Sequence, residues 1–214
     1  RLIALFLLLL SPACGRTVAD GGEPAASGSD AGDAALSPSH VPSIHAAGFR
    51  SCSLDAKGAV ACWGEQTNGI FKPPDPTYLD LAMSGLDVCA LRVDSTLRCW
   101  PGDEGITPPG GTFRQVAAAS WSACALDLGG HVLCWGKSNY GGTKAPPGVF
   151  KAISGRSEHY CALREPDGHP LCWGLNKWGQ ASPPDEELAS VSAGNALSCG
   201  LRTTGTAVCW GLAL

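Results

Sequence analysis

The chain has 214 residues, 44% of them hydrophobic and 16% charged, with a formal net charge of −4 at pH 7. Four acids and two bases precede residue 41, which leaves 15 acids and 13 bases in the rest of the chain. This mildly acidic balance excludes the basic surface that binding to a phosphate backbone requires, so we expect no nucleic-acid partner.

Residues 1–14 have the features of a secretory signal. Arg1 precedes the apolar run LIALFLLLL at 2–10, which is too short to cross a bilayer as a helix, since a crossing takes about 20 residues. A charged start, a short apolar run and small residues after it predict export. The next residues, SPACG at 11–15, resemble a bacterial lipobox. The resemblance implies that Cys14 carries a lipid, which is then the only membrane attachment; simple cleavage near Ala13 is the alternative.

Residues 15–40 read GRTVADGGEPAASGSDAGDAALSPSH and show no hydrophobic periodicity. A segment this rich in Ala, Gly, Ser, Pro and Asp cannot bury enough apolar surface to offset the entropy lost on ordering. We therefore predict a flexible tether between the anchor and the remainder of the chain.

From residue 41 to residue 214 the sequence repeats with a period of 35–38 residues. A period in this range is typical of an array of supersecondary units. Each repeat has two cysteines ten or eleven residues apart, followed directly by a tryptophan. The cysteine pairs are Cys52/Cys62, Cys89/Cys99, Cys124/Cys134, Cys161/Cys172 and Cys199/Cys209. The tryptophans are Trp63, Trp100, Trp135, Trp173 and Trp210.

The residues between paired cysteines predict a β-hairpin, because two short apolar runs flank a turn such as DAKG at 55–58 or PDG at 166–168. In such a hairpin the two cysteines lie opposite each other, with Cβ atoms about 4.5–5.5 Å apart, which is close to disulfide geometry. Export supplies an oxidising compartment. We therefore predict five disulfides, Cys52–Cys62, Cys89–Cys99, Cys124–Cys134, Cys161–Cys172 and Cys199–Cys209, with an acylated Cys14 as the eleventh cysteine. Unbridged buried cysteines are the alternative, whereas zinc sites use tighter spacings such as C-x2-C, so we expect no metal.

Side chains alternate across a strand, so that Cys62 and Trp63 point to opposite faces. A strand that is apolar on both faces is buried on both faces, and blades packed in a ring meet that condition. We predict an all-β fold, a β-propeller, in which the five repeated tryptophans belong to the core.

Two strings illustrate the repeat, ISGRSEHYCALREPDGHPLCWG at 153–174 and VSAGNALSCGLRTTGTAVCWG at 191–211. They resemble the repeat family named after the regulator of chromosome condensation, in its compact bacterial form. The repeat length is also similar to that of propeller-type β-lactamase inhibitor proteins from soil bacteria. The resemblance implies a β-propeller, commonly of seven blades and a monomer when full length. With about five repeats, at 41–76, 77–111, 112–148, 149–185 and 186–214 (truncated), we expect an incomplete ring.

Candidate binding residues are aromatic or polar residues at loop positions of the repeat. Trp121 and Trp178 lie outside the repeated tryptophan position, and variable positions on a rigid scaffold are where binding surfaces are usually built. The candidate patch consists of Phe49, Trp121, Tyr140, His159, Tyr160 and Trp178. The alternative is that these side chains pack on neighbouring blades.

The five histidines are scattered, and the sequence contains no Gly-x-Ser-x-Gly elbow and no phosphate-binding loop. We therefore expect a non-catalytic, lipid-anchored binding module of the bacterial cell envelope, without a cofactor, for a protein or glycan partner. One alternative, by family analogy, is a secreted inhibitor of a β-lactamase or cell-wall hydrolase. Another is an enzyme with its active site at one end of the propeller.

Overall fold

The structure is a computed structural model that describes residues 42–65, 72–83, 87–101 and 107–212. The predicted signal peptide, the tether and Cys14 lie outside these residues. Within the described ranges the chain forms no helix, and every strand belongs to one of five three-stranded antiparallel sheets. We call these sheets blades 1 to 5 in chain order.

The strands of each blade follow one another directly along the chain. Blade 1 contains β1 (Ser43–Ala47), β2 (Arg50–Leu54) and β3 (Val60–Gly64). Blade 2 contains β4 (Tyr78–Met83), β5 (Val88–Arg92) and β6 (Leu97–Trp100). Blade 3 contains β7 (Phe113–Ala119), β8 (Ser122–Asp127) and β9 (Val132–Gly136). Blade 4 contains β10 (Phe150–Arg156), β11 (His159–Arg164) and β12 (Pro170–Gly174), and blade 5 contains β13 (Ser190–Ala193), β14 (Leu197–Leu201) and β15 (Ala207–Gly211).

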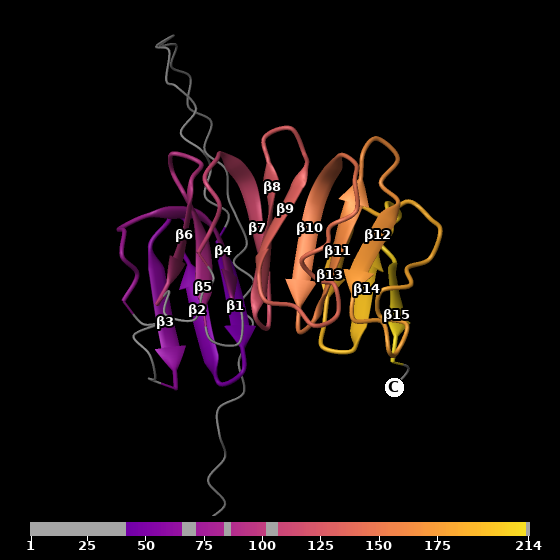
Figure 1. Ribbon diagram of the computed structural model, residues 1–214, viewed down its shortest axis with the longest axis horizontal. Helices are drawn as coiled ribbons and strands as arrows, with labels where there is room; N and C mark the ends of the chain where they lie inside the picture. Colours follow the sequence, from indigo (N-terminus) through magenta and orange to yellow (C-terminus); the bar gives the residue numbers. More distant parts are fainter. Residues whose placement is uncertain (1–41, 66–71, 84–86, 102–106, 213–214) are drawn as a thin grey trace, which may run out of the picture. The chain divides into compact units, whose positions relative to one another are not determined.

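Successive blades stand next to each other in the order of the sequence (Figure 1). The first strands of neighbouring blades contact each other, from β1 to β4, β7, β10 and β13, while the third strand is the outer edge of each blade. This arrangement confirms the predicted all-β propeller fold.

The predicted disulfides are all present. In each blade the second and third strands pair so that the two cysteines face each other, as Cys124 and Cys134 do between β8 and β9. The Cα atoms of the five pairs are 4.0–4.1 Å apart and the sulfur atoms are bonded. The prediction was accurate because the turn between the strands is short and nearly symmetric about the cysteine pair.

Each interface between blades joins two different faces. The face of blade 3 that carries the Cys124–Cys134 disulfide packs against the face of blade 4 that carries Trp173, Phe150 and Ile153. In the same way, the disulfide face of blade 2 packs against the tryptophan face of blade 3. The disulfide face of blade 1 packs against the tryptophan face of blade 2. A blade therefore needs a neighbour on each side to bury both of its apolar faces.

Backbone hydrogen bonds also join successive blades. The turn between the second and third strands contains a residue with positive φ. The carbonyl group of that residue accepts a hydrogen bond from the next blade, where the donor is the first residue of the inner strand or, in blade 5, a residue two positions before it. The donor and acceptor pairs are Tyr78 and Gly58 (2.8 Å), Phe113 and Ser95 (2.8 Å), Phe150 and Gly130 (2.8 Å), and Leu188 and Gly168 (3.1 Å). The donor side chains are completely or almost completely buried.

The prediction that all five repeated tryptophans belong to the core is wrong for Trp63. Trp100 and Trp173 are buried and Trp135 and Trp210 are half-buried, but the Trp63 side chain is 48% exposed. A tryptophan face is buried by the disulfide face of the preceding blade, and no described blade precedes blade 1.

Candidate functional site

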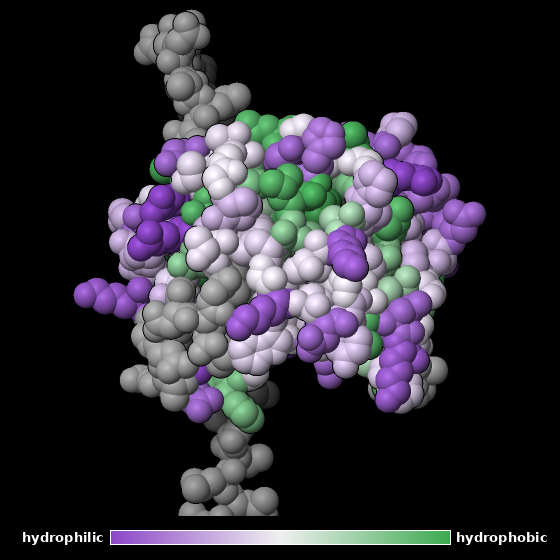
Figure 2. All heavy atoms as spheres, in the orientation of Figure 1, coloured by the Kyte–Doolittle hydropathy of each residue, from purple (hydrophilic) through white to green (hydrophobic). Residues whose placement is uncertain are grey.

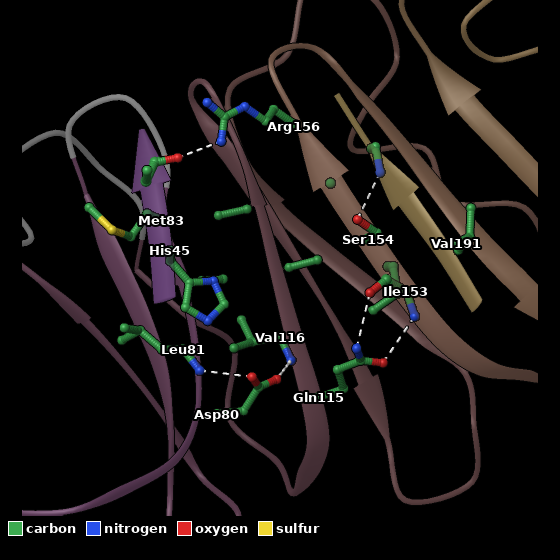
Figure 3. Close-up of a pocket in the computed structure, with 16 residues that line it drawn as sticks. His45, Asp80, Leu81, Met83, Gln115, Val116, Ile153, Ser154, Arg156 and Val191 are labelled. Carbon is green, nitrogen blue, oxygen red and sulfur yellow. Dashed lines mark hydrogen bonds between the residues drawn. The ribbon is translucent and has the colours of Figure 1, made fainter. Parts of the chain in front are cut away.

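The inner strands surround a polar cavity of about 290 Å³ that all five blades line. Figure 3 shows the side chains that point into it, with His45 on β1, Asp80 on β4, Gln115 on β7 and Arg156 on β10. A histidine, a carboxylate and a guanidinium in one cavity would suit a catalytic or ligand-binding centre, so the hydrogen bonds of these groups decide what the cavity does.

Most of these polar groups bind the backbone of a neighbouring inner strand (Figure 3). The Asp80 carboxylate accepts hydrogen bonds from Val116 N (3.0 Å) and Leu81 N (2.9 Å). The Gln115 amide donates to Ile153 O (3.1 Å) and accepts from Ile153 N (2.9 Å). Inner strands of adjacent blades do not pair with each other, so these side chains satisfy edge backbone groups that would otherwise be left unpaired.

Two further contacts extend this pattern. Ser154 Oγ accepts a hydrogen bond from Ala193 N (3.0 Å), and Arg156 donates to Ala46 O across the cavity. His45 Nε2 lies 2.9 Å from Ser43 Oγ, and burial lowers the pKa of His45. Burial also raises the pKa of Asp80, while its two backbone hydrogen bonds act in the opposite direction. The polar side chains that line the cavity therefore hold neighbouring blades together through hydrogen bonds.

A second surface is formed by the turns between the first and second strands together with the loops that follow the third strands. We call it the turn face. In blades 1, 3, 4 and 5 the residue after the third strand donates its backbone N–H to a turn carbonyl, as Lys137 N does to Trp121 O (2.8 Å) and Leu175 N to Glu158 O (2.9 Å). The arrows of β3 and β10 point toward this face in Figure 1. Turn and loop residues of one blade are thus held next to each other.

In blades 1, 3, 4 and 5 a glycine follows the Cys-Trp pair and makes this close approach possible, whereas blade 2 has Pro101 at that position. Gly136 has a φ of 95°, and a Cβ atom at this position would lie 2.5 Å from Trp121 O. A side chain here would therefore both strain the backbone and push the Trp121 turn away from its loop. The Cys-Trp-Gly sequence of the repeat positions the turn face as well as the disulfide.

Four of the six candidate residues are exposed on the turn face. Phe49 (86% exposed) and Trp121 (43%) lie at the tips of first turns, and Tyr140 (53%) and Trp178 (46%) lie at equivalent positions of two successive loops. A cleft of about 230 Å³ between blades 3 and 4 includes Trp121. Neither Phe49 nor Trp178 lines this cleft.

The other two candidates, His159 and Tyr160, do not belong to the turn face, and their prediction as binding residues is wrong. Both side chains are completely buried on β11. His159 Nε2 is 2.7 Å from Ser198 Oγ of blade 5, and the Tyr160 hydroxyl is 2.9 Å from Ser122 Oγ of blade 3. The β10–β11 turn ends at Glu158, the residue equivalent to Trp121, so that His159 and Tyr160 already belong to β11.

Burial changes the acid–base properties of these two residues. It lowers the pKa of His159 to about 4. It also raises the pKa of the Tyr160 hydroxyl, which its hydrogen bond with Ser122 partly opposes. Both side chains are therefore neutral at pH 7 and join blades 3, 4 and 5.

Four polar residues of the Trp121 cleft were not predicted from the sequence. Lys137, Asn139 and Glu158 line it together with Ser138 and Trp121. The signal for Glu158 was its position three residues before the first cysteine, the same as that of Trp121. Lys137 and Asn139 occupy ordinary loop positions, which makes them indistinguishable from solvated surface residues in the sequence.

A separate apolar area lies near β8 and β9, where Figure 2 shows green residues in the upper middle of the molecule. Leu128 (62% exposed) and Leu133 (38%) are the exposed apolar residues of these elements. The nearby Asp127 carboxylate accepts hydrogen bonds from the backbone and, at 3.2 Å, faces the ring of His131. The polar groups next to this area are thus bonded to each other.

Among the described residues, no group of three or more His, Cys, Asp or Glu side chains could hold a metal ion. The same part of the chain has no helix of the length and apolarity that a membrane crossing requires.

Solved structures match this fold, whereas no protein-family model and no curated protein matches the chain. The CRINKLY WD40 ectodomain of the Arabidopsis thaliana receptor kinase ACR4 is 29% identical, with a TM-score of 0.63 over 79% of this chain and 62% of that one. The ectodomain of the Physcomitrella patens receptor kinase CR4 is 25% identical, with a TM-score of 0.68 over 86% and 53%. Yeast RCC1 (Prp20), solved bound to Kap60, is 16% identical, with a TM-score of 0.65 over 79% and 55%. The chain spans less than two thirds of each neighbour, and it has an RCC1-like propeller fold.

Proposed function

We propose that this protein is a non-catalytic β-propeller binding module whose turn face captures a protein or glycan partner. The observation that carries this proposal is the exposure of Phe49, Trp121, Tyr140 and Trp178 on one face. Aromatic side chains of this kind are typical anchors of binding interfaces. They project from turns and loops of disulfide-bonded blades, and loops on a rigid scaffold are where binding residues usually lie.

The chemistry of the inner cavity supports a role without catalysis. Asp80 and Gln115 are hydrogen-bonded to backbone groups of β4, β7 and β10. A group that already binds the backbone on both sides is not available as an acid or base for a substrate. The aromatic side chains of the turn face, by contrast, are exposed and accessible to a partner.

The structural neighbours support a module of this class, because some of them are known in complex with, or by their binding to, other proteins. Yeast RCC1 was solved bound to Kap60, and the Prp20p structure was described with its binding to Gsp1p and histones. The plant neighbours are ectodomains of receptor kinases. By analogy, the present blades form a binding platform, while the chemistry of the partner follows from the residues of this chain.

The proposed location is the bacterial cell envelope. Five disulfides are consistent with an oxidising extracellular compartment. In this proposal residues 1–14 direct export, Cys14 carries the lipid and 15–40 is the tether that lets the propeller reach its partner. Metabolic labelling with a fatty-acid analogue tests it, because wild-type protein takes up the label and Cys14→Ser does not.

Site-specific photo-crosslinking in the producing cell tests the binding face. A photoreactive amino acid at Tyr140 on the turn face should give a discrete adduct with the partner. The matched control is Leu128, an equally exposed apolar residue on the β8–β9 turn at the other end of the blade. Adducts from Leu128 but not from Tyr140 would show that the partner binds another face. Adducts with a β-lactamase or cell-wall hydrolase that loses its activity would favour the inhibitor alternative.

A further inference from the structure

The cleft between blades 3 and 4 combines one aromatic wall with polar groups. Trp121 stands on the β7–β8 turn, Lys137 and Asn139 on the loop after β9, and Glu158 on the β10–β11 turn. Its volume of about 230 Å³ is below the roughly 300–1,000 Å³ of pockets for drug-sized ligands. The cleft is therefore large enough for a single ring or side chain of a larger ligand.

Of the polar side chains of this cleft, Ser138 accepts a hydrogen bond at Oγ from Gly142 N (2.8 Å), whereas the other three are not used within the described part of the protein. The Glu158 carboxylate, the Lys137 ammonium group and the Asn139 amide form no hydrogen bond or ion pair there. Glu158 is half-buried, and this burial raises the pKa of its carboxyl group. A partly desolvated carboxylate without a partner is costly, and a ligand that donates hydrogen bonds would remove that cost.

In the corresponding loop of blade 4, the polar side chains are bound by other residues of the same loop. Asn176 donates to Ser182 Oγ (2.9 Å) and accepts from Ala181 N (2.9 Å), and Lys177 Nζ lies 4.8 Å above the Trp178 ring. The loop after β9 also contains a lysine and an asparagine, but Lys137 and Asn139 line the cleft and have no such partner among the described residues. The two loops therefore differ in whether their lysine and asparagine are bound within the chain.

The charges of the cleft select the class of ligand. A cationic side chain attracted by Glu158 and Trp121 would be repelled by Lys137, and an anion attracted by Lys137 would be repelled by Glu158. A neutral ligand with an apolar face and several hydroxyl groups suits all of these residues. Its hydroxyl groups can donate to the carboxylate of Glu158 and accept from the ammonium group of Lys137 and the amide of Asn139.

We propose that the Trp121 cleft is a saccharide subsite that binds one neutral pyranose ring of a glycan chain. The ring's C–H face lies on the indole of Trp121, and its hydroxyl groups bind Glu158, Asn139 and Lys137. This subsite rests on the proposed function, in which the turn face binds the partner, and it specifies that the partner is a glycan. The site is preorganised, because Gly136 and the bond from Lys137 N to Trp121 O hold turn and loop together.

Saturation-transfer NMR on the full chain tests this subsite with three neutral probes, chitotriose, cellotriose and maltotriose. At least one probe should receive saturation in its ring C–H protons. Trp121→Ala should weaken that binding by roughly tenfold or more, Glu158→Gln by several-fold, and Trp121→Phe less than Trp121→Ala. Trp63→Ala is the matched control, since it removes a tryptophan of similar exposure (48% against 43%) that lies on the tryptophan face of blade 1 and not on the turn face, and it should leave the affinity unchanged.

Each other outcome has a defined meaning. Thermal melting and disulfide mapping of every variant establish that the blades are intact. The subsite is rejected if no neutral probe binds, if Trp121→Ala binds as well as wild type, or if only a polypeptide occupies the cleft. In that case, partner adducts from Tyr140 would still support the proposed function, whereas their absence as well would reject both proposals.

Discussion

Blades 1 and 5 have nearly the same sequence pattern as blades 2 to 4, yet they expose opposite faces. On blade 1 the disulfide face is buried, with Cys52 at 0% exposure, while Ile44 on the tryptophan face is 75% exposed. On blade 5 Leu188 at the tryptophan face is completely buried, while Cys209 and Leu201 on the disulfide face are exposed. In blades 2 to 4 both faces are covered by described neighbours.

This difference shows that burial in the propeller is a property of the interface and not of the repeat. The position eight residues before the first cysteine is at most 4% exposed in blades 2, 3 and 4, where it is occupied by Leu81, Val116 and Ile153. The equivalent residue of blade 1, Ile44, is exposed. In repeat arrays, stability arises from the units and from their nearest-neighbour interfaces. The exposed tryptophan face of blade 1 and the exposed disulfide face of blade 5 are the two kinds of surface that meet at every described interface.

The largest expected effect comes from comparing two tryptophans of the repeat. Trp173→Ala should lower the free energy of unfolding by about 3–5 kcal/mol, because it empties a packed interface and removes the hydrogen bond from Trp173 Nε1 to Gly142 O (2.8 Å). Trp63→Ala should cost less than about 1 kcal/mol, because its side chain is already half exposed. Urea unfolding followed by circular dichroism measures both. Equal costs would contradict the dependence on neighbours.

The second prediction concerns the interface between blades 4 and 5, where His159 is buried. Its pKa is about 4 in the folded protein, below the ordinary value of 6.5, so the unfolded chain binds the extra proton between these values. Stability from this residue is complete above pH 6.5 and is lost as the pH falls toward 4, by up to about 3 kcal/mol. His159→Gln should remove this part of the pH dependence in urea unfolding at pH 4–7. An unchanged slope would show that the histidine is not desolvated.

The smallest expected effect separates two disulfides by their access to reductant. Cys199–Cys209 on the exposed face of blade 5 should be reduced by dithiothreitol at least about tenfold faster than Cys89–Cys99, since thiolate attack needs access to a sulfur atom. Cys89 is 1% exposed and Cys99 is 9% exposed, whereas Cys209 is exposed. Timed alkylation and mass mapping give both rates. Comparable rates would mean that blade 2 opens as readily as blade 5.

The aromatic residues of the candidate site could be identified from the sequence, but which side chains are exposed and which residues they contact could not. Trp121, Tyr140 and Trp178 could be identified because they interrupt a regular repeat at loop positions. His159 and Tyr160 could not be separated from them, because the β10–β11 turn ends at Glu158 and a shift of one residue exchanges an exposed position for a buried one. Asp80 and Gln115 could not be assigned at all, because their partners lie 36 and 38 residues away, in the next blade.

The all-β class, the hairpin in each repeat and the five disulfides follow from the amino-acid sequence alone. The reason is that cysteine spacing, turn residues and alternating side chains act over about ten residues, where the geometry of a hairpin leaves little choice. Tertiary structure alone decided that Trp63 is exposed, that the inner polar residues join blades, and that Lys137, Asn139 and Glu158 meet beside Trp121. These outcomes depend on which blade faces which, and equivalent residues of a repeat differ only through their neighbours.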